Sequence, residues 1–404
     1  MIERITLLGS SSGRNAGDAA LIAGIMDAID TELGRKIRYE IPTINPRYIL
    51  EEYDNHTVPI GMMPWHGAVR MLGIPTWRSI MRTDLTLLFD AILFDRSLYN
   101  PAFNFMSSLY LMLPRAKKRG KRMGCFNVGT GPVSRDMGKK MLKELAELMD
   151  FTTARDQASY DILMDLEVRN PNVAIAADSA VSLRPSSDER AREILKTVAM
   201  SPDEEILCIN VNRYIDTWAG TGRDSIGKAT FAAIYGEALS RVAAEIKVPI
   251  LFVATQHHDV EVSREVIKHI TGEVRTGLVS NETINHHDIK AVFGQTDLMF
   301  GMRLHACILA SSAMTPILGL RYQPKVEYYL QSLGLADTCC ITFDRFDVES
   351  LAAFILAGWG NRHQLKAVLQ EKIPVLQHKA DSTAKLVAAI DRDEDIAAAI
   401  ATLP

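Results

Sequence analysis

Residues 297–320 read DLMFGMRLHACILASSAMTPILGL, and this stretch decides the fold. The apolar run 297–300 predicts a strand that ends at Gly301, residues 304–313 predict a helix, and residues 316–320 predict a second strand. A strand, a helix and a strand in this order are the unit of a parallel sheet with a crossover helix. The stretch therefore indicates an α/β fold.

The same alternation extends on both sides of this unit. On the N-terminal side, a helix is predicted over 18–33, and strands are predicted over 5–8, 85–94, 124–128, 151–154 and 173–175. Near residue 184 the composition changes to proline, serine and acidic residues, and a second series then starts with strands at 206–211 and 249–253. The sequence predicts two Rossmann-like domains in series, arranged as in GT-B proteins with a cleft between them.

Chain length agrees with this division, because 404 residues exceed the size that one hydrophobic core usually reaches. We expect an N-terminal Rossmann-like domain over 1–185, a linker over 186–204 and a C-terminal Rossmann-like domain over 205–345. The remaining residues, 346–404, are alanine-rich near their end and predict C-terminal helices.

Composition and charge argue against several classes of protein. The net charge of −4 provides no field that would hold a polyanion, so no nucleic-acid partner is expected. Five cysteines without CxxC spacing, in apolar surroundings, indicate reduced thiols. The N-terminal residues predict a strand and not a signal peptide, and no apolar run reaches the ~20 residues of a membrane-spanning helix. We expect a cytoplasmic protein.

The predicted helix at Leu304 offers a site for an anion. Arg303 and His305 lie in its first turn, where free backbone N–H groups and the helix dipole favour negative charge. A guanidinium adds a bidentate clamp for a carboxylate or a phosphate. Lys325 and Arg213 are further candidates for such contacts. The structural alternative is that Arg303 pairs with a carboxylate and that His305 is a core histidine.

The first loop, residues 9–18, joins the first strand to the first helix, where open α/β sheets bind ligands. It lacks both the Gly-Lys-Ser/Thr of a Walker A loop and the GxGxxG pattern of dinucleotide sites. Asp18 is placed to cap the helix. The functional alternative is that Asn15 and Asp18 bind sugar hydroxyls, or that Asp18 accepts a hydroxyl proton.

Five motifs in order resemble the polysaccharide pyruvyl transferase family. They are Asn15-x-Gly17-Asp18-x-Ala20-Leu21, Gly129-Thr130-Gly131-Pro132, Ala154-Arg155-Asp156-Gln157-Ala158-Ser159, Ala177-Asp178-Ser179-Ala180 and the stretch from Gly301-Met302-Arg303-Leu304-His305 to Tyr322-x-x-Lys325. The resemblance covers about residues 5–335. One departure stands near residue 90, where relatives usually carry a glycine-rich turn and this chain has Phe89-Asp90-Ala91.

The resemblance implies transfer of pyruvate from phosphoenolpyruvate to two hydroxyls of a sugar, forming a cyclic ketal. The acceptor would be a cell-surface polysaccharide unit or its lipid-linked precursor. In that reaction we expect His305 to act as general acid, because its ordinary pKa lies near working pH. Arg303, Lys325 and Arg213 would bind the donor in the C-terminal domain, and Asn15 and Asp18 would bind the acceptor.

Two His-His-Asp tripeptides, at 257–259 and 286–288, raise the alternative of a metal site. Each precedes a predicted helix, where Asp259 or Asp288 would cap the helix and the histidines would be loop residues. We therefore expect no metal, and no cofactor beyond phosphoenolpyruvate as co-substrate.

Six of the eight residues 115–122 are basic, and they follow the apolar stretch 103–113. An apolar face beside a basic cluster is typical of enzymes that rest on anionic membranes. Peripheral contact through 103–122 with the inner face of the membrane would suit a lipid-linked acceptor. A solvated helix end is the alternative.

Two other functions remain as alternatives. The first is a GT-B glycosyltransferase that uses a nucleotide sugar, although the basic surroundings of Arg321 and Lys325 suit a small anion better than a ribose. The second is a non-catalytic, degenerate relative, which the altered turn near residue 90 would explain.

Overall fold

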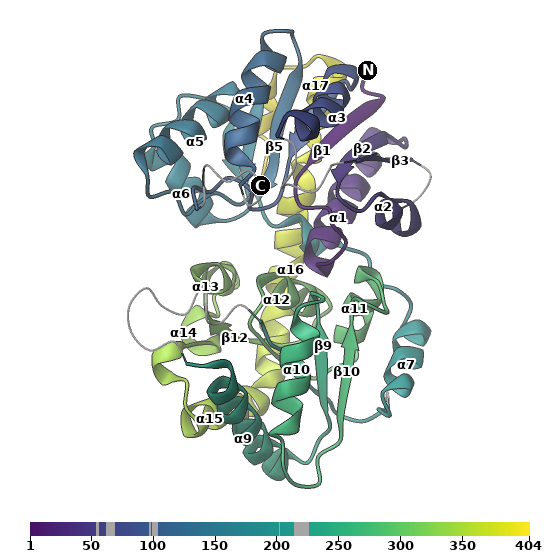
Figure 1. The fold of residues 1–404 in the computed structure, drawn as a ribbon, viewed down its shortest axis with the longest axis vertical. Coiled ribbons are helices and arrows are strands. Elements are labelled where there is room, and N and C mark those ends of the chain that lie inside the picture. The colour runs from purple at the N-terminus through teal and green to yellow at the C-terminus, as the bar shows by residue number, and fades with distance from the viewer. Residues whose placement is uncertain (54–55, 62–68, 97, 99–103, 202, 214–225) are drawn as a thin grey trace. The chain divides into compact units, whose positions relative to one another are not determined.

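The structure, a computed structural model, describes residues 1–53, 56–61, 69–96, 98, 104–201, 203–213 and 226–404. The chain forms two compact units (Figure 1). The first unit contains residues 1–13, 18–182 and 375–404, and the second contains residues 14–17 and 183–374. A four-residue piece of the first loop thus belongs to the second unit, and the C-terminal segment belongs to the first.

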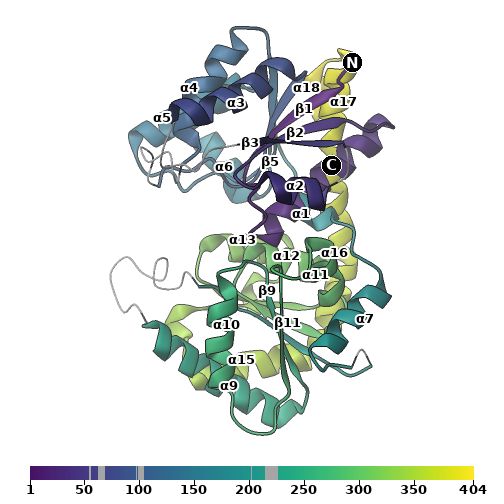
Figure 2. The same cartoon turned by 45° about the vertical axis from the view of Figure 1, so that its right-hand side comes forward.

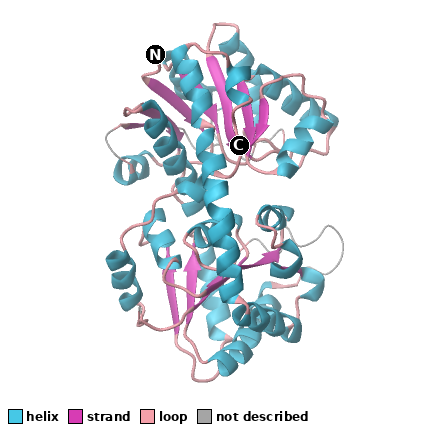
Figure 3. Ribbon diagram, turned by 180° about the vertical axis from the view of Figure 1, so that it is seen from behind, coloured by secondary structure: helices cyan, strands magenta, loops and turns pink. Residues whose placement is uncertain are grey.

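The first unit contains a parallel sheet with the strand order β3-β2-β1-β4-β5-β6-β7. Its central strands are buried along almost their whole length, because helices cover both faces of the sheet (Figure 3). The strands are β1 (Arg4–Leu8), β2 (Arg38–Thr43), β3 (Thr57–Gly61), β4 (Leu85–Leu88), β5 (Arg122–Val128), β6 (Phe151–Ala154) and β7 (Val173–Ile175).

The helices of this unit come from both ends of the chain. Those before residue 183 are α1 (Ala16–Leu33), α2 (Pro46–Glu52), α3 (Val69–Arg82), α4 (Met106–Lys117), α5 (Asp136–Leu148) and α6 (Gln157–Asp165). Helix α16 (Arg362–Ser382) carries the chain back from the second unit, and α17 (Ala384–Arg392) and α18 (Ile396–Ile400) complete the first.

The second unit contains a parallel sheet with the strand order β10-β9-β8-β11-β12-β13. The strands are β8 (Leu207–Asn210), β9 (Ile250–Ala254), β10 (Thr276–Ser280), β11 (Leu298–Gly301), β12 (Ile317–Arg321) and β13 (Cys340–Thr342). The helices are α7 (Asp188–Thr197), α9 (Lys228–Ile246), α10 (Asp259–Lys268), α11 (His286–Phe293), α12 (Leu304–Ser312), α13 (Pro324–Ser332), α14 (Ala336–Cys339) and α15 (Val348–Gly360). Figure 2 shows α9 beside α10 and α15, against which it packs.

Each sheet has one point at which the strand order reverses. In the first unit it lies between β1 and β4, and in the second between β8 and β11. Such switch points leave a crevice outside the carboxyl ends of the two strands, and ligands of doubly wound sheets bind there. The loops after β1, β4, β8 and β11 are therefore where binding residues are expected.

The predicted fold class is confirmed, since both sheets are parallel and carry crossover helices. The strand predicted over 85–94 is too long, because β4 ends at Leu88 and Asp90 has a left-handed φ of 64° that leaves the extended conformation. Residues 186–204 contain helix α7. The cleft expected between the domains stays a prediction.

No helix among the described residues is long and apolar enough to cross a membrane. Within the same ranges, no three His, Cys, Asp or Glu side chains converge as a set of metal ligands.

Candidate functional site

The switch point of the second unit brings together the residues after β8 and after β11. Asn210, the last residue of β8, is fully buried, and its side chain donates to the carbonyl of Val253 at 2.8 Å. The same side chain accepts a hydrogen bond from the backbone N–H of Arg303 at 3.1 Å. The Asn210 carbonyl accepts from the N–H of Met302, also at 3.1 Å. Asn210 thus fixes the turn that leads into α12.

Helix α12 begins at Leu304, as predicted, with Arg303 at its N-cap position and His305 as its second residue. The Arg303 carbonyl accepts the first intrahelical bond, from Cys307, at 3.0 Å. The side chain of Arg303 makes no capping bond. The first turn of α12 therefore presents backbone N–H groups and the positive end of its dipole at the carboxyl edge of the sheet.

The Arg303 guanidinium is held by a buried carboxylate. Its Nη2 donates to Oδ1 of Asp259 at 2.7 Å, its Nε pairs with the other carboxylate oxygen, and Nη2 also donates to Asn212 at 3.2 Å. Asp259 is fully buried, and only 12% of the Arg303 side chain is exposed. The structural alternative for Arg303, a carboxylate pair, is thus realised. It compensates the charge of the guanidinium and fixes its orientation.

Further positive charge gathers next to this pair. The backbone N–H of Arg213 donates to Asp259 at 3.1 Å, and its guanidinium donates to Nδ1 of His258 at 3.1 Å. Burial and then the charges of Arg213 and Arg14 lower the pKa of His258. The positive charges of Arg213 and Arg14 beside His258 suit an anionic ligand.

The first loop contributes directly to the second unit. Residues 14–16 run beside the segment after β9: the N–H of Ala16 donates to Thr255 at 2.8 Å, and the N–H of His257 donates to Arg14 at 3.1 Å. A Cβ added to Gly17 would lie 2.2 Å from Nδ1 of His305. Only a glycine allows the backbone to approach the imidazole this closely. The motif at residue 15 and the motif at residue 303 therefore meet at His305.

The two residues predicted to bind the acceptor, Asn15 and Asp18, belong to different units. Asn15 belongs to the second unit and immediately precedes α1, where its Oδ1 accepts from the N–H of Gly17 at 3.0 Å. It therefore takes the capping position that was expected for Asp18. Asp18 is the third residue of α1 and belongs to the first unit, where burial and nearby acidic groups including Asp18 raise the pKa of Tyr48.

The remaining predicted donor residues lie after β8 and after β12. Arg213 is exposed, and Lys325 is half-buried as the second residue of α13. Tyr322, which also follows β12, is buried beside Asn212, and burial is the main cause that raises the pKa of Tyr322 to about 12. Tyr322 thus remains a neutral hydroxyl at physiological pH.

The capping roles expected for Asp259 and Asp288 are wrong. His258 occupies the N-cap of α10, and Asp259 binds Arg303 because a fully buried carboxylate requires a charged partner. Asn285 caps α11 through the N–H of Asp288, whose own carboxylate binds Ser186 at 2.7 Å and Arg190 at 3.2 Å. Sequence reasoning missed Asp259, Asn210 and Asn212 as parts of the site, although an asparagine that ends a buried strand was a usable signal.

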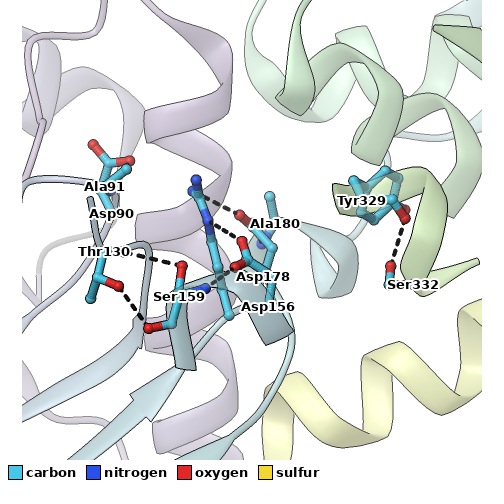
Figure 4. A network of polar contacts seen from close by, with 10 residues as sticks. Asp90, Ala91, Thr130, Asp156, Ser159, Asp178, Ala180, Tyr329 and Ser332 are labelled. Carbon is cyan, nitrogen blue, oxygen red and sulfur yellow. Dashed lines mark hydrogen bonds and ion pairs between the residues drawn. The ribbon is translucent and has the colours of Figure 1, made fainter. Parts of the chain in front are cut away.

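A second polar network lies at the carboxyl edge of the first sheet (Figure 4). Arg155, with a buried side chain, pairs with Asp178 at 3.3 Å and with Asp156 at 3.4 Å. Thr130 donates through its hydroxyl to the Ser159 carbonyl at 2.8 Å. These contacts join three of the motifs that carry the family resemblance.

Solved structures with the same fold include nucleotide-sugar enzymes. One is a putative UDP-N-acetylglucosamine 2-epimerase from Listeria monocytogenes, with TM-score 0.68, 12% identity and coverage of 98% of both chains. Another is Alr3699/HepE of Anabaena in complex with UDP, with TM-score 0.59, 13% identity and coverage of 99% of this chain and 100% of the other. A glycosyltransferase from Rickettsia africae has TM-score 0.58, 12% identity and coverage of 99% of both chains.

These likenesses define the class of the protein, a GT-B-like α/β fold with two parallel sheets. The sequence pattern of polysaccharide pyruvyl transferases matches residues 15–324, from Asn15 to the first residue of α13. The chain belongs to the polysaccharide pyruvyl transferase family.

Proposed function

We propose that this protein transfers pyruvate from phosphoenolpyruvate to two hydroxyls of a sugar, forming a cyclic ketal. The sugar belongs to a cell-surface polysaccharide or to its lipid-linked precursor. The proposal is carried by the family match over residues 15–324. It is supported by the first turn of α12, whose free backbone N–H groups favour an anion.

The electrostatics of the second unit support a small, doubly anionic donor. Asp259 compensates Arg303, and Arg213 and Arg14 lie close enough to His258 for their charges to act on it. Lys325 is proposed as a further cation for the donor. Phosphoenolpyruvate carries a carboxylate and a phosphate, which the α12 N–H groups and these cations can share. Arg303, fixed by Asp259, presents a preorganised guanidinium to one of the two groups.

The reaction needs one general acid at the methylene carbon. His305 donates a proton to that carbon as the hydroxyl oxygen of the acceptor bonds to the central carbon. The second hydroxyl then forms its C–O bond as the C–O bond to phosphate breaks. Of the two hydroxyl protons released, one replaces the proton of His305 and the other leaves with phosphate. Asn15 and Asp18 are proposed to orient the acceptor.

Acceptor-dependent release of phosphate from phosphoenolpyruvate tests the proposal. A sugar product heavier by pyruvate less one water identifies the ketal. We expect His305→Ala and Arg303→Ala to lower kcat/KM by about 10²–10⁴-fold, the range for loss of an acid or of an electrostatic contact. Arg241→Ala, which breaks only exposed ion pairs, is the matched control. Full activity in the His305 or Arg303 variant would contradict the role proposed for that residue.

A nucleotide-sugar glycosyltransferase is the second candidate, because HepE with the same fold was solved with UDP. Glu327, the nearest acidic residue after β12 in the sequence, pairs with Arg321 at 3.1 Å. Release of UDP from a sugar nucleotide without turnover of phosphoenolpyruvate would favour this candidate. Absence of both activities would favour a degenerate relative.

The proposed location is the cytoplasmic face of the membrane, where a lipid-linked acceptor is accessible. In α4, Leu111 is 55% exposed, and Arg115, Lys118 and Arg119 are exposed near it. Lys117 instead pairs with Asp150 at 2.8 Å. Of the predicted contact segment 103–122, residue 103 lies outside the described residues.

Flotation with phosphatidylglycerol vesicles tests this contact. We expect Leu111→Ser and the pair Arg115→Gln and Lys118→Gln to reduce the bound fraction, because apolar insertion and charge attraction both contribute. Lys268→Gln, on an exposed face of the second unit, should bind like the unmodified protein. Unchanged flotation of these variants would show that residues 103–122 do not bind the membrane.

A further inference from the structure

Asp90 lies where this chain departs from the sequence pattern of the family. It lies two residues after the end of β4, at the switch point of the first sheet, where β4 pairs with β1. The two strand ends are closely packed, because a Cβ on Gly9 would lie 2.5 Å from the ring of Phe89. Ligands of doubly wound sheets bind at this position. The chain thus places a carboxylate where relatives usually carry a glycine-rich turn.

The backbone of Asp90 is fixed in an unusual conformation. Its φ of 64° lies in the left-handed region, which aspartate tolerates better than most residues. The carbonyl of Asp90 accepts from the N–H of Gly129 at 3.3 Å. Farther along the loop, the carbonyl of Leu93 accepts from Gly131 at 2.7 Å, and Asp95 accepts from the N–H of Ser134 at 2.6 Å. These hydrogen bonds hold the backbone of residues 90–95 in place, and with it Asp90.

The carboxylate of Asp90 is only partly used by the protein. The residue is 9% exposed, and one carboxylate oxygen accepts from the N–H of Ala91 at 2.6 Å. In the part of the chain that the structure describes, no other hydrogen bond reaches this carboxylate. In Figure 4 it points away from the Thr130–Ser159 contacts. A buried carboxylate with unused lone pairs can accept a hydrogen bond from a sugar hydroxyl.

Arg155 supplies positive charge behind the Asp90 loop. Its guanidinium packs against Gly129, where an added Cβ would lie 2.8 Å away. Burial lowers the pKa of Arg155, but the carboxylates of Asp178, Asp156 and Asp90 raise it by more. The net effect is a raised pKa, so the guanidinium stays charged. Asp156 and Asp178 therefore hold Arg155 in place. The carboxylate of Asp90 is the one of these three that we consider available to a ligand.

We propose that Asp90 is a catalytic residue of the acceptor subsite, where its carboxylate binds one sugar hydroxyl and accepts the proton of that hydroxyl. The inference rests on the proposed pyruvyl transfer. In the first bond-forming step, the hydroxyl oxygen bonds to the central carbon of the donor while its proton moves to Asp90. The proton passes to phosphate when phosphate leaves, which restores the carboxylate.

Three variants separate catalysis from structure. Asp90→Asn keeps the shape and the tolerance of left-handed φ but removes the basic oxygen. Asp90→Gly restores the residue type usual in the family and relieves the backbone, so its melting temperature should not fall. Asp95→Asn is the control: it weakens a structural carboxylate of the same loop, so its melting temperature should fall while its kinetic constants stay within a few-fold.

The measurements use the full chain, phosphoenolpyruvate and a panel of p-nitrophenyl hexopyranosides. We expect Asp90→Asn and Asp90→Gly to lower kcat/KM for the acceptor by about 10²–10⁴-fold, the range for a general base. Phosphoenolpyruvate binding, measured by calorimetry, should stay unchanged. Acceptor kinetics of Asp90→Asn equal to those of the unmodified protein would overturn the inference.

Binding of the same glycosides, followed by saturation-transfer NMR, separates this inference from the proposed function. If the unmodified protein binds glycosides through Asp90 but releases no phosphate from phosphoenolpyruvate, the proposed function fails and the sugar subsite stands. If the protein is active and Asp90→Asn is equally active, the function stands and the role of Asp90 fails. A protein that neither binds nor converts any glycoside of the panel overturns both.

Discussion

At the residue scale, the surroundings of His305 are set by a residue almost three hundred positions away in sequence. Gly17 lies against the imidazole so closely that any Cβ would overlap the ring. The turn on the other side is fixed by Asn210, and the neighbouring Arg303 is fixed by Asp259. The position of His305 thus depends on the backbone at Gly17 and on the turn that Asn210 holds.

Gly17→Ala tests this dependence. The added methyl must displace the imidazole or residues 14–17, which costs about 1–3 kcal/mol, as is usual for overpacking. We expect a lower free energy of unfolding in urea and a large loss of kcat for phosphate release. Gly360→Ala is the control, because that helical glycine has open space around its Cβ position and should gain slightly in stability. Equal behaviour of the two variants would contradict the role of Gly17.

The sequence correctly predicted Arg303 and His305 at the start of a helix, because local rules apply to them. A short apolar strand, a glycine and a helix start are visible within ten residues. The partner of Arg303 was not visible, because Asp259 approaches it only after β9 and β11 have taken their places in the sheet. Asp259 and Asp288 both follow a His-His pair, and local pattern alone assigned them the same wrong capping role.

At the element scale, three of the strands that the sequence missed, β2, β3 and β10, have mixed composition. Strand β2 contains Arg38, Glu40 and Pro42, so it shows no apolar run. Glu40 is nevertheless buried, because Ser79 donates to it at 2.6 Å and Arg82 at 2.7 Å. Strands β3 and β10 contain proline or glycine and were missed for the same reason. The central strands were predictable, since they are apolar on both faces.

Helix α11 shows how one element anchors the chain that enters the second unit. Lys290 is 2% exposed, and its ammonium group donates to the carbonyl of Leu183 at 2.6 Å. One turn earlier, Nδ1 of His287 bonds the carbonyl of Arg184 at 2.6 Å. Burial lowers the pKa of Lys290 from 10.5 to about 7. Helix α11 also packs against α7, so the anchor extends from residue 183 through α7.

The lowered pKa of Lys290 predicts a pH dependence of stability. Between pH 7 and 10.5 the unfolded chain binds a proton that the folded chain does not, so the free energy of unfolding should rise with pH in this window. Below pH 7 both states are protonated and the contribution is constant. We expect Lys290→Met to flatten the rise between pH 7 and about 9 in urea titrations. Exposed Lys268→Met is the control, and parallel curves for all three proteins would contradict the assignment.

At the scale of the whole molecule, the last residues of the chain complete the first unit. Helix α17 buries Leu386, Val387 and Ile390 among others. The side chain of buried Asn127 donates to the carbonyl of Ala380 at 2.9 Å and accepts from Thr383 at 2.7 Å. The sequence predicted helices here but not their partner, because an apolar helix face does not identify the surface that covers it.

A chain that ends at Pro374 should therefore lose the folded first unit. Removal of a single large buried aliphatic side chain costs roughly 2–5 kcal/mol. Loss of all of α17 thus exceeds the roughly 5–15 kcal/mol that stabilises a typical domain. We expect calorimetry to show one transition fewer, and proteolysis to cut residues 18–182 while 183–374 stays protected. A chain that ends at Asp395 lacks only α18, which buries no residue, and should melt like the full chain. A first unit that remains protected in the shorter chain would show that its core closes without α17.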